Sequence, residues 1–193
     1  MITRNRIYRI FAKIYTAWIK ATKKNFSHGP KLIIDPRTRI INKGKIELGE
    51  NVHLRSISRG YQAGMPFPTT LLIDIQGAMI KIGSGSRING VYIHAQKSIT
   101  IGSDCMIASG VNIMDSDGHR VHCDDRLHKR DTPVEIEIGN NVWIGLNAII
   151  LKGTKIGDNS VVGAGAIVKG EFPSNSIIVG NPAKVVKYVE IPK

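Results

Sequence analysis

Residues 138–168 read IGNNVWIGLNAIILKGTKIGDNSVVGAGAIV, and this stretch repeats every six residues. The repeated position is a β-branched aliphatic residue, at Ile138, Ile144, Ile150, Ile156, Val162 and Val168. A second position, four residues later, is small or β-branched in each of the first five repeats: Val142, Ala148, Thr154, Ser160 and Ala166. Neither a helix nor a long strand has this period, whereas a fixed repeat is typical of a solenoid.

The repeat is best explained by short strands separated by tight turns. Gly139-Asn140-Asn141 and Gly157-Asp158-Asn159 are residue types that tolerate the unusual backbone angles of such turns. Three strands close a triangular coil of roughly eighteen residues, whose aliphatic side chains point inward and stack on the neighbouring coils. The same phase recurs upstream, at Ile82, Ile88, Ile101, Ile107 and Ile113, and more weakly at Leu48 and Leu54. We therefore predict an all-β protein, a parallel β-helix over residues 31–187, in preference to an ordinary β-sandwich.

The first 30 residues differ in character, because they are strongly basic. The chain of 193 residues has a formal net charge of +12. Eight basic residues precede the first acidic residue, Asp35: Arg4, Arg6, Arg9, Lys13, Lys20, Lys23, Lys24 and Lys31. Apolar residues recur at intervals of three and four and predict an amphipathic helix over residues 4–24: Ile7, Tyr8, Phe11, Ile14, Tyr15 and Trp18. Residues 1–30 thus form a basic helical segment, which either caps the open end of the β-helix or makes peripheral contact with a membrane.

Composition excludes several other classes of protein. Cys105 and Cys123 are too few for a disulfide framework, and no zinc-finger spacing occurs, so we expect no metal. The chain has neither a long apolar run nor a signal-peptide pattern, so we predict a cytoplasmic protein, with the inner face of the membrane as the alternative location. The positive net charge is the only feature that favours nucleic-acid binding. Since charge alone is not sufficient evidence, we expect no binding to nucleic acid.

Three segments carry a family resemblance: Ile138-Gly-Asn-Asn-Val-Trp-Ile-Gly145, Ile156-Gly-Asp-Asn-Ser-Val-Val-Gly-Ala-Gly165 and Val179-Gly-Asn-Pro-Ala-Lys184. They resemble the hexapeptide-repeat acyltransferases, which include maltose, galactoside, serine and polysaccharide acetyltransferases. The resemblance covers residues 40–187, leaving 188–193 as a C-terminal tail. It implies a left-handed β-helix and a homotrimer, with acetyl-CoA bound between neighbouring subunits and the active sites at these interfaces.

The repeat is interrupted between residues 115 and 133, where Asp115-Ser-Asp-Gly-His119 opens a polar excursion loop. Acyl transfer to a hydroxyl needs a base, and histidine suits this role because its ordinary pKa lies near neutrality. His119 matches the position of the family's catalytic histidine, with His122 as the competitor. A carboxylate or a carbonyl should hold the other ring nitrogen, and Asp115, Asp117 and Glu135 are the candidate carboxylates.

The resemblance also assigns residues to the two substrates. The candidates for the acetyl-CoA cleft are Trp143, Gly145, Leu146, Gly163 and Ala164, with Lys169, Lys184 and Lys187 for its phosphates. Asn89 and Asp117 are the candidates for binding the acceptor. Cys105 falls at the small inward position of a repeat and is interpreted as core rather than as a nucleophile.

The sequence therefore predicts an acetyl-CoA-dependent O-acetyltransferase that modifies a saccharide hydroxyl, in surface or exopolysaccharide biosynthesis, with His119 as general base. Three alternatives remain. In the first, the acceptor is an amino sugar, serine or an antibiotic. In the second, the chain is a β-helix scaffold without activity. In the third, His94, His119 and His122 bind the zinc ion of a γ-type carbonic anhydrase.

Overall fold

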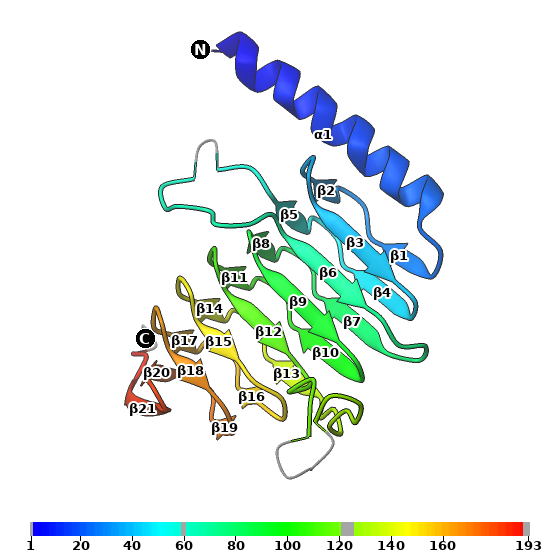
Figure 1. The fold of residues 1–193 in the computed structure, drawn as a ribbon. Helices are drawn as coiled ribbons and strands as arrows, with labels where there is room; N and C mark the ends of the chain where they lie inside the picture. The colour runs from blue at the N-terminus through cyan, green and yellow to red at the C-terminus, as the bar shows by residue number, and fades with distance from the viewer. Residues whose placement is uncertain (1, 59–60, 121–125, 191–193) are drawn as a thin grey trace.

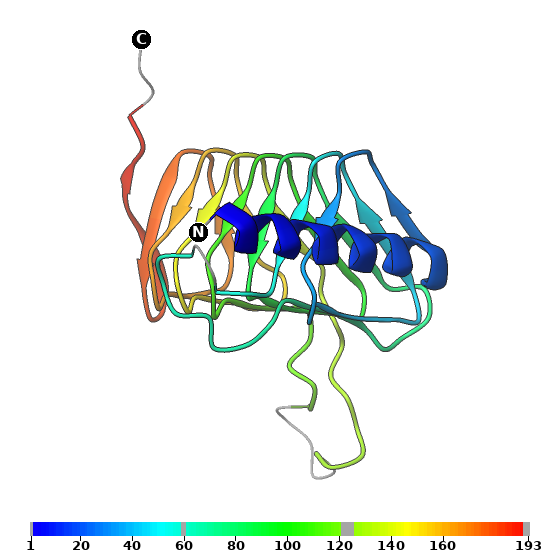
Figure 2. The same ribbon diagram turned by 90° about the horizontal axis from the view of Figure 1, so that it is seen from above.

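The computed structural model describes residues 2–58, 61–120 and 126–190, and in these ranges the chain forms one α-helix and 21 β-strands. The helix α1 spans Ile2–Thr22. The strands form three sheets, which are the three sides of a triangular parallel β-helix (Figures 1 and 2). The predicted β-helix with an N-terminal helix is confirmed.

Each turn of the β-helix contributes one short strand to each sheet. Sheet A consists of β1 (Phe26–His28), β4 (Lys45–Leu48), β7 (Met79–Ile82), β10 (Ser98–Ile101), β13 (Ile136–Ile138), β16 (Lys155–Ile156) and β19 (Glu171–Phe172). Sheet B consists of β2 (Ile33–Ile34), β5 (His53–Arg55), β8 (Arg87–Asn89), β11 (Met106–Ile107), β14 (Trp143–Ile144), β17 (Val161–Val162), β20 (Ser176–Gly180) and β21 (Ala183–Tyr188). Sheet C consists of β3 (Arg39–Asn42), β6 (Thr70–Ile73), β9 (Tyr92–Ala95), β12 (Asn112–Met114), β15 (Ile149–Ile150) and β18 (Ile167–Val168). All paired strands are parallel except the final pair, β20 and β21.

The six-residue repeat places successive aliphatic residues on successive sheets. Ile138 pairs with Ile156 in sheet A, and Ile144 with Val162 in sheet B. The repeated positions of 138–168 are all buried, and they form one core with the equivalent residues upstream. Cys105 belongs to this core, as predicted, and burial raises the pKa of its thiol.

The corner between sheets A and B is turned by residues with a left-handed backbone. Asn141 has a φ of 52° and Asn159 a φ of 58°, values that asparagine tolerates better than most residues. The Nδ2 group of Asn141 donates to Oδ1 of Asn159, 3.0 Å away, and Asn159 donates in turn to Asn175 on the next coil. The asparagines of the repeat therefore form a ladder along this corner.

Two segments leave the β-helix at different corners. Residues 56–69 connect β5 to β6, between sheets B and C, and form a loop that was not predicted from the sequence. Residues 115–135 connect β12 to β13, between sheets C and A, and are the predicted excursion loop. The described parts of the excursion loop project away from the body (Figure 2).

The helix predicted over residues 4–24 is α1, and it lies across the N-terminal end of the β-helix (Figure 1). Its buried side carries Ala12, Thr16 and Ile19. The hydroxyl of Thr16 accepts a hydrogen bond of 2.8 Å from the backbone N–H of Ile34 in β2, so α1 satisfies a polar group of the first coil. The predicted apolar face is divided: Tyr15 turns toward the first coil, whereas Phe11, Ile14 and Trp18 remain exposed.

Candidate active site

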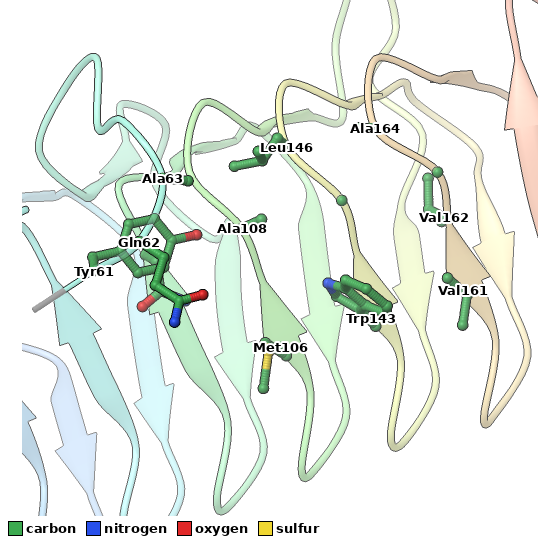
Figure 3. A pocket seen from close by; sticks show the side chains of 13 residues that line it. Tyr61, Gln62, Ala63, Met106, Ala108, Trp143, Leu146, Val161, Val162 and Ala164 are labelled. Atoms are coloured by element: carbon green, nitrogen blue, oxygen red, sulfur yellow. The ribbon is translucent and has the colours of Figure 1, made fainter.

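A cleft of about 570 Å³ lies on the outer surface of sheet B (Figure 3). It is lined by residues of β8, β11, β14 and β17, of the corner turns that follow, and of loop 56–69: Tyr61, Gln62, Ala63, Asn89, Met106, Ala108, Trp143, Gly145, Leu146, Val161, Val162, Gly163 and Ala164. Six predicted site residues are thus brought together: Asn89, Trp143, Gly145, Leu146, Gly163 and Ala164.

The floor of the cleft follows from strand register. Met106 pairs with Trp143, and Trp143 pairs with Val161, so their outward side chains form a row across β11, β14 and β17. Trp143 is 53% exposed although it is large and apolar. A long, flexible ligand that is mostly uncharged could lie along this row and remove its apolar surface from water.

The glycines beside the cleft are required by the stacking of coils. A Cβ at Gly145 would lie 2.7 Å from the backbone nitrogen of Ala164, and one at Gly163 would lie 2.9 Å from Cγ1 of Val179. Both glycines were predicted from the sequence to lie in the acetyl-CoA cleft, where the lack of a side chain lets a ligand approach the backbone closely. The structure gives a second reason, since the adjacent residue of the next coil occupies the space.

Loop 56–69 forms one wall of the cleft, through Tyr61, Gln62 and Ala63. The loop is bonded to the coil two turns further along the β-helix, because the backbone N–H of Ser109 donates to the Tyr61 hydroxyl over 3.2 Å and the Ser109 hydroxyl donates to the carbonyl of Gly64. These contacts join residues more than 40 positions apart. The only sequence signal for the loop is a break in the repeat that contains Gly64, Pro66 and Pro68.

Asn89 lies at the end of β8, where this wall meets the floor. Its side chain is almost fully buried, and its Nδ2 group donates a hydrogen bond of 2.8 Å to the carbonyl of Ile107. This bond fixes the orientation of the amide at the edge of the cleft.

His119 is exposed on the excursion loop, and its Nδ1 atom lies 2.6 Å from the backbone carbonyl oxygen of Arg126. A carbonyl only accepts hydrogen bonds, so Nδ1 carries the proton in this contact. The neutral ring then has an unprotonated Nε2, the form that a general base requires. The orienting group is therefore a backbone carbonyl.

The three predicted carboxylates have other partners. Asp115 is fully buried and accepts hydrogen bonds from the backbone N–H groups of Gln96, Lys97 and Ser98 at 2.7–2.8 Å. Glu135 forms an ion pair with Lys97. Asp117, also predicted to bind the acceptor, forms an ion pair of 2.6 Å with Lys152 and does not line the cleft.

Asp131 holds together the base of the excursion loop. Its carboxylate accepts hydrogen bonds from the Ser116 hydroxyl (2.5 Å), the Asp117 backbone N–H (2.8 Å) and the Lys152 ammonium group (2.7 Å). Burial alone would raise its pKa, but the bonds from Lys152 and Ser116 outweigh burial and lower the pKa of Asp131 to about 2. The two carboxylates raise the pKa of Lys152 in return, Asp117 contributing most.

The predicted phosphate-binding lysines lie outside the cleft. Lys184 and Lys187 are exposed on β21, which extends sheet B beyond the cleft at the C-terminal end. Lys169 is exposed just after β18, on the adjacent sheet C.

Two further sequence hypotheses concern residues near the excursion loop. His122 and Cys123 lie outside the described residues. His94, invoked for a zinc site, bonds through Nε2 to Asp74 at 3.0 Å, and within the described ranges no cluster of metal-ligating side chains is found.

His119 and the cleft lie at different corners of one chain. The cleft follows sheet B and its corner with sheet C, whereas the excursion loop leaves from the corner between sheets C and A. His119 does not line the cleft. Within one chain, therefore, His119 and the cleft do not form a single site.

Comparison with known proteins supports the prediction of the family. Residues 135–169 match the family described as the hexapeptide repeat of succinyl-transferase. A protein of Escherichia coli (strain K12), provisionally named the lipopolysaccharide biosynthesis O-acetyl transferase WbbJ, is 34% identical over 158 residues, which are 77% of this chain and 74% of WbbJ. The galactoside O-acetyltransferase of the same strain is 39% identical over 114 residues, 58% of this chain and 56% of that enzyme.

A solved structure shares the fold. A variant of AntD, an N-acyltransferase from Bacillus cereus in complex with dTDP and coenzyme A, superimposes with a TM-score of 0.66, at 22% identity and 89% coverage of both chains. Sequence repeat, β-helix and relatives agree, and the chain belongs to the hexapeptide-repeat acetyltransferase family of O-acetyltransferases.

Proposed function

We propose that this protein transfers an acetyl group from acetyl-CoA to a hydroxyl group of a saccharide, in the synthesis of a surface or exported polysaccharide. The observation that carries the proposal is the cleft on sheet B, where six residues predicted from the sequence lie together around an apolar floor. The relatives at 34% and 39% identity are named O-acetyltransferases, which favours a hydroxyl acceptor. The N-acyltransferase shares the fold at 22% identity and carries no argument for an amine.

The donor lies along the cleft in this proposal. The pantetheine arm contacts Trp143, Leu146 and Ala164, and the phosphates extend toward Lys184 and Lys187 on β21. Burial of the apolar arm on Trp143 supplies affinity, while the lysines attract the phosphates as point charges.

His119 acts as the general base. Its Nδ1–H stays on the Arg126 carbonyl, and Nε2 removes the proton of the acceptor hydroxyl as the oxygen attacks the thioester carbonyl carbon. The tetrahedral intermediate then collapses with cleavage of the C–S bond. The thiolate leaves as coenzyme A and takes the proton from the imidazolium, so no acyl-enzyme forms.

The complete site belongs to a homotrimer. Because His119 and the cleft lie at different corners, the excursion loop of one subunit supplies the base to the cleft of its neighbour. Tyr61, Gln62 and Asn89 form the wall at the reacting end and position the sugar.

A thiol-release assay with acetyl-CoA and a panel of saccharides, amino sugars and serine tests the proposal. We expect release with hydroxyl-bearing saccharides and a loss of at least about 100-fold in kcat for His119→Ala, with donor binding retained. His28→Ala is the matched control, because His28 is exposed on the first coil, remote from the cleft. Release with amines alone would contradict the assignment of the acceptor, and full turnover by His119→Ala would contradict the mechanism. Light scattering that shows a monomer active at full rate would contradict the shared site.

A further inference from the structure

The outer surface of α1 carries a stripe of large apolar side chains that no other part of the described ranges covers. Ile7, Ile10, Phe11, Ile14 and Trp18 are each 53–61% exposed. They are spaced by three and four residues, so they lie along one side of the helix. We call these five residues the outer stripe.

Attachment of α1 to the β-helix does not use the outer stripe. The opposite side of α1 provides the contacts, through the buried residues Ala12, Thr16 and Ile19. The Tyr15 hydroxyl also donates a hydrogen bond of 2.7 Å to the carbonyl of Thr38. Tyr8, on the same side, bonds to Asp35, and burial together with this carboxylate raises the pKa of its hydroxyl. The helix therefore has two distinct apolar sides, and capping accounts for one of them.

Basic side chains flank the outer stripe. Arg9, Lys13 and Lys20 follow one another at intervals of four and seven residues and share one side of α1, between the buried side and the outer stripe. Lys23 and Lys24 follow directly after the helix, and no acidic residue precedes Asp35. A row of positive charge beside exposed aromatic and aliphatic groups is the pattern of a helix that lies in the interface of an anionic bilayer.

We propose that α1 docks this enzyme on an anionic phospholipid membrane. The outer stripe enters the boundary between headgroups and acyl chains, and Arg9, Lys13 and Lys20 bind lipid phosphates. Within the described residues no helix is long and apolar enough to cross a bilayer, so α1 lies in the plane of the surface. The positive charge favours a lipid surface over a second copy of the same helix, which would bring like charges together.

The orientation that results leaves the active site accessible. Because α1 crosses the N-terminal end of the β-helix (Figures 1 and 2), docking through α1 points the axis of the β-helix away from the membrane. The cleft on sheet B and the excursion loop then lie on the sides of the body, along the surface where a lipid-linked saccharide is presented. In a trimer with parallel β-helix axes, three helices face the same membrane and their affinities combine.

Vesicle flotation of the full chain tests the proposal, with phosphatidylcholine vesicles that either contain or lack phosphatidylglycerol. We expect binding to the anionic vesicles that weakens as salt is raised. The variant Phe11→Ser with Ile14→Ser should bind at least about tenfold more weakly, because it removes two side chains from the apolar contact. Arg9→Gln with Lys13→Gln should bind several-fold more weakly and lose part of the salt dependence.

The matched control is Val186→Ser with Tyr188→Ser, because these residues are 58% and 59% exposed on β21, at the opposite end of the β-helix. This variant should bind vesicles as the parent does, and turnover of a small soluble acceptor should be unchanged in the helix variants, which shows that they fold. Failure of the parent to float with anionic vesicles at low salt overturns the proposal, as does undiminished binding by the Phe11→Ser, Ile14→Ser variant. If that variant instead reduces the size of a larger oligomer in light scattering, the outer stripe is a protein interface and the proposal is wrong. The test is independent of the acceptor, so it can fail while the proposed function stands.

Discussion

Replacing Asp131 by asparagine should slow catalysis without weakening the binding of acetyl-CoA. Asp131 ties Ser116, the Asp117 backbone and Lys152 together at the base of the loop that carries His119. Its pKa of about 2, against an ordinary 3.8, corresponds to about 2 kcal/mol of stabilisation of the charged form in the folded state. Asparagine keeps one acceptor oxygen, has an NH2 donor in place of the other oxygen, and loses the charge that attracts Lys152.

A loss of about 2 kcal/mol allows the loop to leave its ordered arrangement up to about 30 times more often. We therefore expect kcat to fall about tenfold, while KM for acetyl-CoA stays within about twofold, because the residues that line the donor cleft do not include the excursion loop. Steady-state thiol release measures both constants, and hydrogen exchange of residues 126–135 reports the loosening directly. Glu171→Gln is the control, since Glu171 meets Lys155 at 3.8 Å with both side chains largely exposed. An unchanged kcat, or a rise in KM for the donor at constant kcat, would refute the reasoning.

Four further outcomes are expected. The stabilisation from Asp131 should be lost on acidification, because a lowered pKa stabilises the fold above about pH 4 and this stabilisation disappears as pH falls toward 2. Hydrogen exchange or proteolysis of the excursion loop across this pH range measures the loss. The Asp131→Asn variant should show a weaker dependence of exchange on pH. Ile144→Ala should lower the free energy of unfolding by about 2–5 kcal/mol, measured by urea denaturation, because Ile144 is fully buried between coils. Trp143→Ala should raise KM for acetyl-CoA about tenfold with a smaller change in kcat, and an unchanged KM would remove Trp143 from the donor site. Tyr61→Ala should raise KM for the saccharide more than KM for the donor, which competition kinetics can separate.

The coils were predictable because each repeated residue meets the same surroundings on every turn. Ile138, Ile144 and Ile150 occupy equivalent inward positions on three sheets, so their spacing in the sequence was enough to predict a three-sided β-helix. Upstream the repeat is less regular, since Ile82 pairs with Ile101 and Ile93 with Ile113, one or two residues beyond a full coil. Ile82, Ile101 and Ile113 were nevertheless recognised as repeat positions and are buried, whereas Ile93 was not recognised.

The remaining features depend on contacts that a linear pattern does not encode. The Arg126 carbonyl that orients His119 is a backbone group, and any residue type could supply it. Tyr61 reaches the cleft because Ser109, on a different coil, holds its loop. The helical period predicted an amphipathic α1, but it predicted one apolar face where the structure has a buried side and an exposed side. The small residues Ala12 and Thr16, which contact the β-helix, gave no hydrophobic signal.

The position of α1 also bears on how a repetitive β protein remains a discrete particle. Among the described residues, the strands of the first coil have a pairing partner on one side only, and such unpaired edges invite another copy to add end to end. Each added copy would present the same surface again, so growth would continue as a fibre. By covering the first coil and bonding Ile34 through Thr16, α1 closes this route at one end. Removal of the helix is therefore a route to polymerisation, in addition to any loss of membrane contact.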